Sequence, residues 1–444
     1  MRYPKIVVTP PGPKAKEIVD KDHDLISPSF GRAYPLAVKS GKGCIITDVD
    51  GNEFIDLNAG LAVLSVGHSH PKVTAAIKEQ VDRFLHYSYT DFYYDTYIDL
   101  GETLHDLIPG DFKKKFYYGN SGAEAVECAI KLSRWHSKRQ LMLAYIGSFH
   151  GRTLGAVSLT ASKPVQRGGF SPLIPGVNHI FYPYCYRCPF NLEHPGCGFR
   201  CVSYIDDYLF HKFVPPEEVA MILAEPIQGE GGYVVPPDGY WDELKKLLDE
   251  HGILLAMDEI QTGIGRTGKW FASEHFGVVP DIITIAKGIA AGMPLGITSA
   301  REELMDWPPG SHASTFGGNP VSTAAANAVI KIIKEEKLLE NSEKQGAYLK
   351  KRLEEMMDGH KMIGDVRGKG LMVGVELVKD RETKEPAKEE TVDVMMRCFR
   401  KGAALVNCGV STIRWMPPLV ITRELLDSAL EIFEGCLSEV EAKL

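Results

Sequence analysis

The stretch Ile282-Ile283-Thr284-Ile285-Ala286-Lys287-Gly288 decides how the chain is expected to fold. A near-continuous apolar run of this kind is typical of a strand that is buried on both faces of a mostly parallel sheet. Three similar runs precede it, at residues 141–146, 220–224 and 253–257. Helical stretches separate them, including residues 123–138 and 242–251. This alternation of strands and helices predicts a layered α/β domain.

Ionisable residues follow three of the predicted strands directly, namely Glu225, Asp258 and Lys287. Ligands of parallel α/β sheets bind at the carboxyl ends of the strands, so we expect these side chains to line a site. Burial disfavours the charged form of a lysine and makes its neutral amine available as a nucleophile. Considered alone, Lys287 fits better as a lysine that snorkels at the end of a strand.

Asp258 needs a partner, because a buried carboxylate is costly to leave unpaired. The protonated pyridine nitrogen of a cofactor is a suitable partner, and capping of the following turn is the alternative.

Residues 118–124 place small side chains before an amphipathic helix. Backbone N–H groups and the helix dipole favour a phosphate at such a place, although Ser121 and Glu124 also fit a capping box. Farther along, Phe149 could stack on a flat ring and Arg152 could clamp a carboxylate. A core aromatic and a surface ion pair are the simpler interpretations of these two residues.

These stretches occur in one order along the chain, together with residues 225–232 and 315–320. In that combination the sequence, from about Gly41 to Glu439, resembles the class III aminotransferases. These are fold type I enzymes that depend on pyridoxal 5′-phosphate (PLP). The resemblance implies an α/β fold with a large, mostly parallel-sheet domain and a smaller α+β domain built from the N- and C-terminal segments. We expect the N-terminal segment of the smaller domain at residues 1–66, the large PLP-binding domain at 67–320 and the C-terminal part at 321–444.

The resemblance also implies roles around the cofactor. Lys287 would form the Schiff base with PLP and move a proton between Cα and C4′, and Asp258 would pair with the pyridine nitrogen. Thr315 would reach the phosphate of the neighbouring subunit's cofactor, so the active site would require a homodimer. The implied cofactor-binding residues are Ser121, Gly122, Ala123, Phe149, His150, Glu225, Asp258, Gln261, Lys287 and Thr315.

Glu230, the third implied catalytic residue beside Lys287 and Asp258, matches the glutamate of a gate over an arginine, here Arg414. While Glu230 covers Arg414, a donor with a terminal amine enters with no α-carboxylate at Arg414. When Glu230 swings away, Arg414 binds the α-carboxylate of glutamate or 2-oxoglutarate. A structural salt bridge is the alternative. The other residues implied in substrate binding are Leu61, Tyr89, Thr90, Asp91 and Arg152.

The sequence is most similar to the archaeal ornithine/4-aminobutyrate branch of the family. This predicts an ω-aminotransferase that moves the amino group of ornithine, lysine or 4-aminobutyrate to 2-oxoglutarate. An amino acid racemase on the same scaffold is the alternative. In related racemases an aspartate stands at the position of Glu230, so the glutamate here favours transfer. A non-catalytic binding protein is disfavoured by the intact Lys287, Asp258 and Thr315.

Composition narrows the remaining possibilities. The net charge of −8 is spread along the 444 residues and argues against a nucleic-acid partner. We expect a cytoplasmic protein without a membrane partner, because the chain has neither a membrane-length apolar run nor a signal peptide. No metal cofactor is expected. One cysteine cluster has the spacing of a structural zinc loop, but reduced thiols or a labile disulfide are favoured over zinc. Its members are Cys185, Cys188, Cys197 and Cys201.

Overall fold

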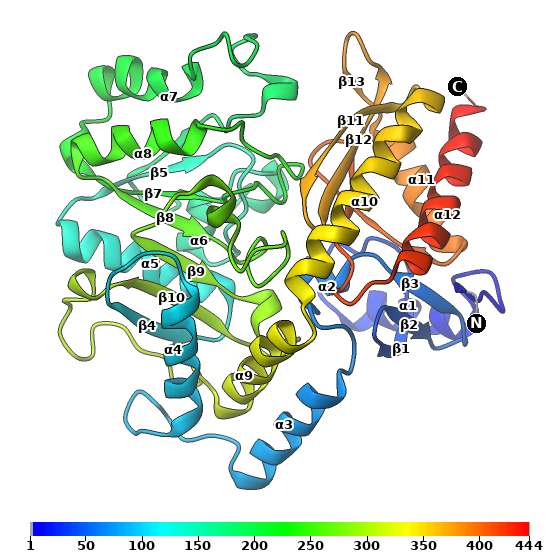
Figure 1. The fold of residues 1–444 in the computed structure, drawn as a ribbon, viewed down its shortest axis with the longest axis horizontal. Helices are drawn as coiled ribbons and strands as arrows, with labels where there is room; N and C mark the ends of the chain where they lie inside the picture. Colours follow the sequence, from blue (N-terminus) through cyan, green and yellow to red (C-terminus); the bar gives the residue numbers. More distant parts are fainter. Residues whose placement is uncertain (1–2, 444) are drawn as a thin grey trace.

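The computed structural model describes residues 3–443, which form a larger and a smaller lobe (Figure 1). The larger lobe contains a seven-stranded sheet with the order β4-β10-β9-β8-β7-β5-β6. The strands from β9 to β6 run parallel, whereas β10 runs antiparallel to both of its neighbours. The bounds are β4 Lys114–Gly119, β5 Leu141–Tyr145, β6 Val177–Ile180, β7 Val219–Ala224, β8 Leu254–Asp258, β9 Ile282–Ile285 and β10 Gly296–Arg301.

The centre of this sheet shows why continuous apolar runs became strands. Along β7, Ile222 packs in the core beneath α8 (Tyr240–His251), whereas its neighbour Met221 packs beneath α5 (Gly122–Ser137) and α6 (Leu154–Leu159). Successive side chains of a strand point to opposite faces, so helices on both faces favour apolar residues at most positions of a strand. The predicted parallel α/β sheet is therefore confirmed, with helix bounds within two residues of those expected.

The smaller lobe combines the two ends of the chain. β14 pairs in parallel with β3, so a C-terminal strand completes the N-terminal sheet of order β1-β2-β3-β14. A hairpin with Asp50-Gly51-Asn52 at its turn joins β2 and β3 in this sheet. The second sheet has the order β11-β12-β16-β15, with β13 paired to β12. The strand bounds are β1 Val38–Lys42, β2 Ile45–Asp48, β3 Glu53–Asp56, β11 Ile363–Lys369, β12 Met372–Asp380, β13 Glu385–Pro386, β14 Ala403–Ala404, β15 Val406–Cys408 and β16 Thr412–Trp415.

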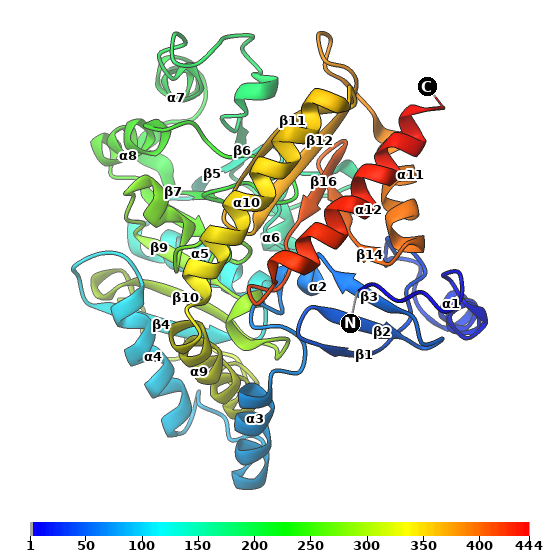
Figure 2. The same ribbon diagram turned by 45° about the vertical axis from the view of Figure 1, so that its right-hand side comes forward.

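The remaining helices lie around these sheets, and Figure 2 shows α10 and α12 along one side of the smaller lobe. None of the helices within residues 3–443 is long and apolar enough to cross a membrane. The bounds are α1 Pro13–Leu25, α2 Ala59–Ala62, α3 Pro71–Arg83, α4 Asp95–Leu107, α7 Arg200–Tyr204, α9 Pro320–Glu335, α10 Leu338–Gly359, α11 Lys388–Arg400 and α12 Arg423–Glu441.

The packing of α9 bears on where the chain passes into the smaller domain. α9 packs against α3 and α4, whereas α10 packs against β11 and α12. We therefore propose that the second domain boundary lies between α9 and α10, near Lys337, about one helix later than the boundary expected at residue 320.

We predict that Gly296→Ala destabilises the fold at the start of β10. A Cβ atom on Gly296 would lie 1.9 Å from the backbone oxygen of Ser121. The backbone around Ser121 must therefore move, at a cost of about 1–3 kcal/mol. The matched control is Gly435→Ala in α12, where a Cβ atom would meet nothing within 4 Å. Thermal unfolding should show a lower midpoint for Gly296→Ala and an unchanged or higher one for Gly435→Ala. Equal midpoints for the two variants would contradict this account.

Candidate active site

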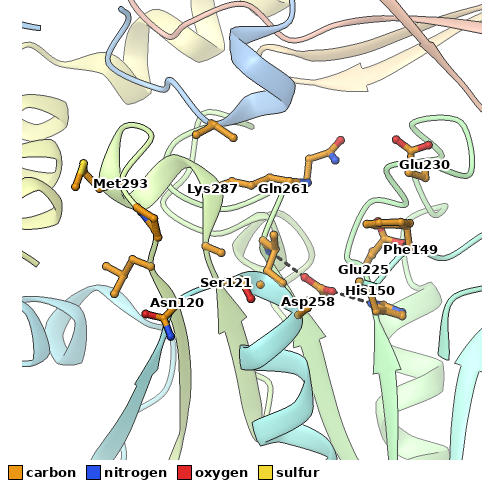
Figure 3. Close-up of a pocket in the computed structure, with 18 residues that line it drawn as sticks. Asn120, Ser121, Phe149, His150, Glu225, Glu230, Asp258, Gln261, Lys287 and Met293 are labelled. Carbon is orange, nitrogen blue, oxygen red and sulfur yellow. Dashed lines mark hydrogen bonds and ion pairs between the residues drawn. The ribbon is translucent and has the colours of Figure 1, made fainter. Parts of the chain in front are cut away.

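A cavity of about 300 Å³ lies at the carboxyl ends of β7, β8 and β9 (Figure 3). Ten of the predicted site residues line it: Ser121, Gly122, Ala123, Phe149, His150, Glu225, Glu230, Asp258, Gln261 and Lys287. Residues from positions far apart in the sequence meet here because parallel strands end at one edge of their sheet.

Asp258 and His150 form a buried pair beneath the cavity. His150 Nδ1 lies 2.7 Å from Asp258 Oδ2, and the backbone N–H of Ile260 donates to Asp258 Oδ1 at 3.1 Å. Both carboxylate oxygens therefore have a partner, which satisfies the condition for burying this group. The turn-capping alternative is also correct, since the bond to Ile260 is a cap of that kind.

Lys287 is partly buried where the chain leaves β9. Its backbone has a φ of 47°, which is uncommon for a residue with a side chain and is often found at functional sites. Burial lowers the pKa of Lys287, and this effect outweighs the opposite effect of Asp258. The neutral amine, which is the nucleophilic form, is thereby favoured.

The N-terminus of α5 forms another wall of the cavity. Ser121 Oγ accepts a hydrogen bond from the N–H of Glu124 at 3.2 Å, so the predicted helix cap is present. The first-turn N–H groups of Gly122 and Ala123 have no acceptor within the helix, because intrahelical bonding begins one turn later. A cap and an anion site therefore coexist at this helix end.

Glu225 connects the loop that carries Phe149 with the loop that carries Glu230. Its carboxylate accepts hydrogen bonds from the N–H of Phe149 at 3.1 Å and from the N–H of Gly229 at 2.8 Å. Burial raises the pKa of Glu225 to about 7, although His150 acts in the opposite direction. Glu225 is thus a proton-holding group in the same cavity as Lys287.

Glu230 and Arg414 meet as predicted, with 2.7 Å between Oε1 and Nη1. Arg414 is buried on β16 of the smaller lobe, so this ion pair joins the two lobes at the cavity. Lys163 Nζ lies 3.5 Å from the other carboxylate oxygen, Oε2. Burial alone would raise the pKa of Glu230, but Arg414 and Lys163 outweigh burial and lower it. Glu230 is therefore held in its charged form.

The other predicted residues are not among the lining residues of this chain: Leu61, Tyr89, Thr90, Asp91, Arg152, Thr315 and Arg414, the last of which contacts the lining residue Glu230. Arg152 is exposed, with its guanidinium 5.5 Å from the Phe149 ring centre. Thr90 donates to the backbone oxygen of Ser314 at 3.0 Å, so its loop packs beside the exposed Thr315. Their roles in binding remain predictions.

The cavity also has lining residues that the sequence did not single out. Asn120 and Ile260 are adjacent in the sequence to predicted site residues, and only this adjacency could have indicated that they line the cavity. Met293 and Leu295 follow the small-residue stretch after Lys287 without any motif of their own. These lining residues without a predicted role are Asn120, Gly151, Ile260, Ala286, Met293, Pro294 and Leu295, whereas Val63, which also lines the cavity, ends the segment 58–63 that the family resemblance implies at the entrance.

The clustered cysteines Cys185, Cys188, Cys197 and Cys201 all carry free thiols. Within residues 3–443, no group of three or more His, Cys, Asp or Glu side chains is arranged to hold a metal ion.

Comparisons with known proteins bear on the family and the fold of this chain. The family model described as "Aminotransferase class-III" matches residues 27–437. The chain is 46% identical to an alanine/serine racemase of Pyrococcus horikoshii, over 99% of this chain and 94% of that protein. It is 40% identical to a probable 4-aminobutyrate aminotransferase of Bacillus subtilis, over 90% and 92% respectively. The crystal structure of an amine transaminase from an uncultivated Pseudomonas species, in its PLP-bound form, superposes with a TM-score of 0.85 at 31% identity, covering 91% of this chain and 95% of that one. The predicted fold class is therefore confirmed.

We predict that Glu225→Gln changes how stability depends on pH. Since folding raises the pKa of Glu225 from 4.5 to about 7, the folded protein binds more protons between these values, and its stability falls as the pH rises. Glutamine mimics the neutral carboxyl group. The variant should therefore gain stability relative to the wild type by up to about 3 kcal/mol between about pH 5 and 8, as measured by thermal unfolding. A difference that stays constant across this range would contradict the raised pKa.

Proposed function

Because the chain belongs to the class III aminotransferase family, we propose that it is an ω-aminotransferase. It moves the amino group of ornithine, lysine or 4-aminobutyrate type donors to 2-oxoglutarate. The observation that carries this proposal is the 2.7 Å contact between Arg414 and Glu230, since Glu230 lines the same cavity as Lys287.

PLP is the cofactor of this family, and the cofactor predicted from the sequence is thereby confirmed. The residues present fit it. Asp258, held by His150, suits the pyridine nitrogen, and the first turn of α5 suits the phosphate. Gln261 Oε1 is buried without a hydrogen-bond partner among the described residues, which leaves it able to accept one from a ring hydroxyl. When bound, PLP withdraws electrons from the Cα of an amino acid.

Lys287 supplies the amine that holds the cofactor and then moves the substrate proton. Both tasks need a neutral amine, and burial lowers the pKa of Lys287 in that direction. Phe149 lines the same cavity and offers a flat apolar face for the cofactor ring. The bonds of Glu225 to the N–H groups of Phe149 and Gly229 hold this face in place relative to the gate.

Glu230 and Arg414 select between two kinds of substrate. With the pair closed, the cavity accepts a terminal amine and binds no carboxylate at Arg414. With the pair open, Arg414 offers a bidentate site for an α-carboxylate. The Nε atom of Arg414 is buried and has no partner within residues 3–443, so the guanidinium keeps a donor for such a ligand. Arg152 holds the distal carboxylate of 2-oxoglutarate.

A second subunit completes the site. Thr315 is exposed and lies outside the cavity wall of its own chain, as expected for a residue that contacts the cofactor of a neighbour. Tyr89, Thr90 and Asp91 belong to the loop that packs beside Thr315, and we assign them to the same shared surface. Asp91 would suit a cationic distal amine there.

Racemisation is the second candidate, favoured by the 46% identity to an alanine/serine racemase. A racemase needs an acid or a base on the cofactor face opposite Lys287. Glu230 stands where an aspartate fills that role in related racemases, and its close contact with Arg414 favours the gate.

One assay separates transfer from racemisation. The enzyme is incubated with single L-amino acids or 4-aminobutyrate, with and without 2-oxoglutarate, and Lys287→Ala serves as the inactive control. We expect glutamate to form only when both the donor and 2-oxoglutarate are present. The opposite result has two parts: a D-isomer appears without 2-oxoglutarate, and no glutamate forms when 2-oxoglutarate is present. That result would replace aminotransfer by racemisation as the proposed function.

We predict that Glu230→Ala impairs the two half-reactions unequally. Without the Glu230 carboxylate, Arg414 is always free to bind an α-carboxylate. Ornithine and lysine then bind through their α-carboxylates, and their terminal amines are not placed for reaction. Single-turnover rates with ω-amine donors should fall about tenfold or more, while those with glutamate should change little. Glu250→Ala removes an exposed glutamate of α8 and is the matched control. An equal loss in both half-reactions would point to a structural salt bridge.

A further inference from the structure

Lys163 is a second cation at the carboxylate of Glu230. Glu230 Oε1 faces Arg414 at 2.7 Å, and Glu230 Oε2 faces Lys163 Nζ at 3.5 Å. The two cations differ in burial, since the side chain of Arg414 is 6% exposed and that of Lys163 is 37% exposed. The carboxylate therefore has one buried partner and another that is nearer to solvent.

The backbone around Glu230 is fixed, so the carboxylate can leave Arg414 only by rotation of its side chain. The backbone oxygen of Glu230 accepts a hydrogen bond from the N–H of Gly409 at 2.8 Å. Two residues later, the oxygen of Gly232 accepts bonds from Arg367 Nε at 3.0 Å and Nη2 at 2.5 Å. On the other side of Glu230, the N–H of Gly229 donates to Glu225 at 2.8 Å, so the loop is held both before and after Glu230.

The segment that carries Lys163 is fixed as well. The N–H of Ala161 donates to the oxygen of Ser148 at 2.9 Å, and the N–H of His150 donates to Thr160 Oγ1 at 2.9 Å. These bonds tie the segment before Lys163 to the loop of Phe149 and His150. Hydrogen bonds therefore hold the backbone next to Lys163, whose ammonium group contacts Glu230.

Opening the gate separates Glu230 from a buried guanidinium, and an unpaired carboxylate in such a place is costly. A charge-assisted hydrogen bond is about 2.8 Å long, so the 3.5 Å contact with Lys163 has room to shorten as the side chain rotates. A group that binds one of two states more strongly shifts the population toward that state.

We propose that Lys163 holds the Glu230 carboxylate when it leaves Arg414, which makes Lys163 a positioning residue for carboxylate-bearing substrates. This inference rests on the proposed function. It assigns Lys163 to the half-reaction of glutamate and 2-oxoglutarate and not to the half-reaction of the ω-amine donor, which needs the gate closed.

The test uses glutarate, a dicarboxylate that cannot exchange an amino group, titrated into the PLP-loaded dimer by calorimetry. Lys163→Met should bind glutarate about three- to fivefold more weakly than the wild type, and Lys163→Arg should restore the affinity. Single-turnover rates should fall with glutamate and not with 4-aminobutyrate. Lys212→Met is the control, since Lys212 is exposed and forms no ion pair with a residue in the described range 3–443.

A double variant shows whether Lys163 acts through Glu230. In the Glu230→Ala background, adding Lys163→Met should leave glutarate binding unchanged, because the carboxylate that Lys163 holds is gone. A loss that persists in this background means that Lys163 contacts the ligand directly and overturns the proposal. Equal affinities of the wild type and Lys163→Met also overturn it, as does a wild type that binds no glutarate. Failure of the proposed function is recognised separately, as the absence of glutamate formation by the wild type.

Discussion

Parallel strands end at one edge of their sheet, and the rest of the site depends on this constraint. β7, β8 and β9 deliver Glu225, Asp258 and Lys287 to a single cavity although these residues are tens of positions apart. The helices that cover both faces of the sheet keep the strands buried, so the polar groups can only emerge at the ends. The N-terminus of α5 closes the same edge and adds its N–H groups.

The carboxylates at this edge of the sheet need hydrogen-bond or ion-pair partners, and each of the three has a different set of partners. Asp258 is paired with His150 and a backbone N–H, Glu225 is held by two backbone N–H groups, and Glu230 is shared between two cations. The first two arrangements are fixed and suit cofactor binding. Glu230, in contrast, has two alternative cationic partners, Arg414 and Lys163, and this is the physical basis of the proposed gate. The smaller lobe takes part in that choice through Arg414.

The same scaffold serves enzymes with different reactions, as the names of its relatives show. Transfer and racemisation differ in the groups that face the cofactor, and the proposed gate assigns Glu230 and its partners Arg414 and Lys163 to the choice between them.

The parallel sheet, the order of the motifs and the family could be predicted from the residues alone, because buried strands and helix starts are encoded in local patterns of residues. The sequence also predicted the pairing of Glu230 with Arg414 through the resemblance to that family. The folded structure was needed to show that His150 supports Asp258, that Glu225 accepts a bond from the loop of Phe149, and that Lys163 reaches Glu230. These three contacts join residues 67 to 108 positions apart. No local pattern encodes such contacts, because their distances are set by how the loops pack at the edge of the sheet.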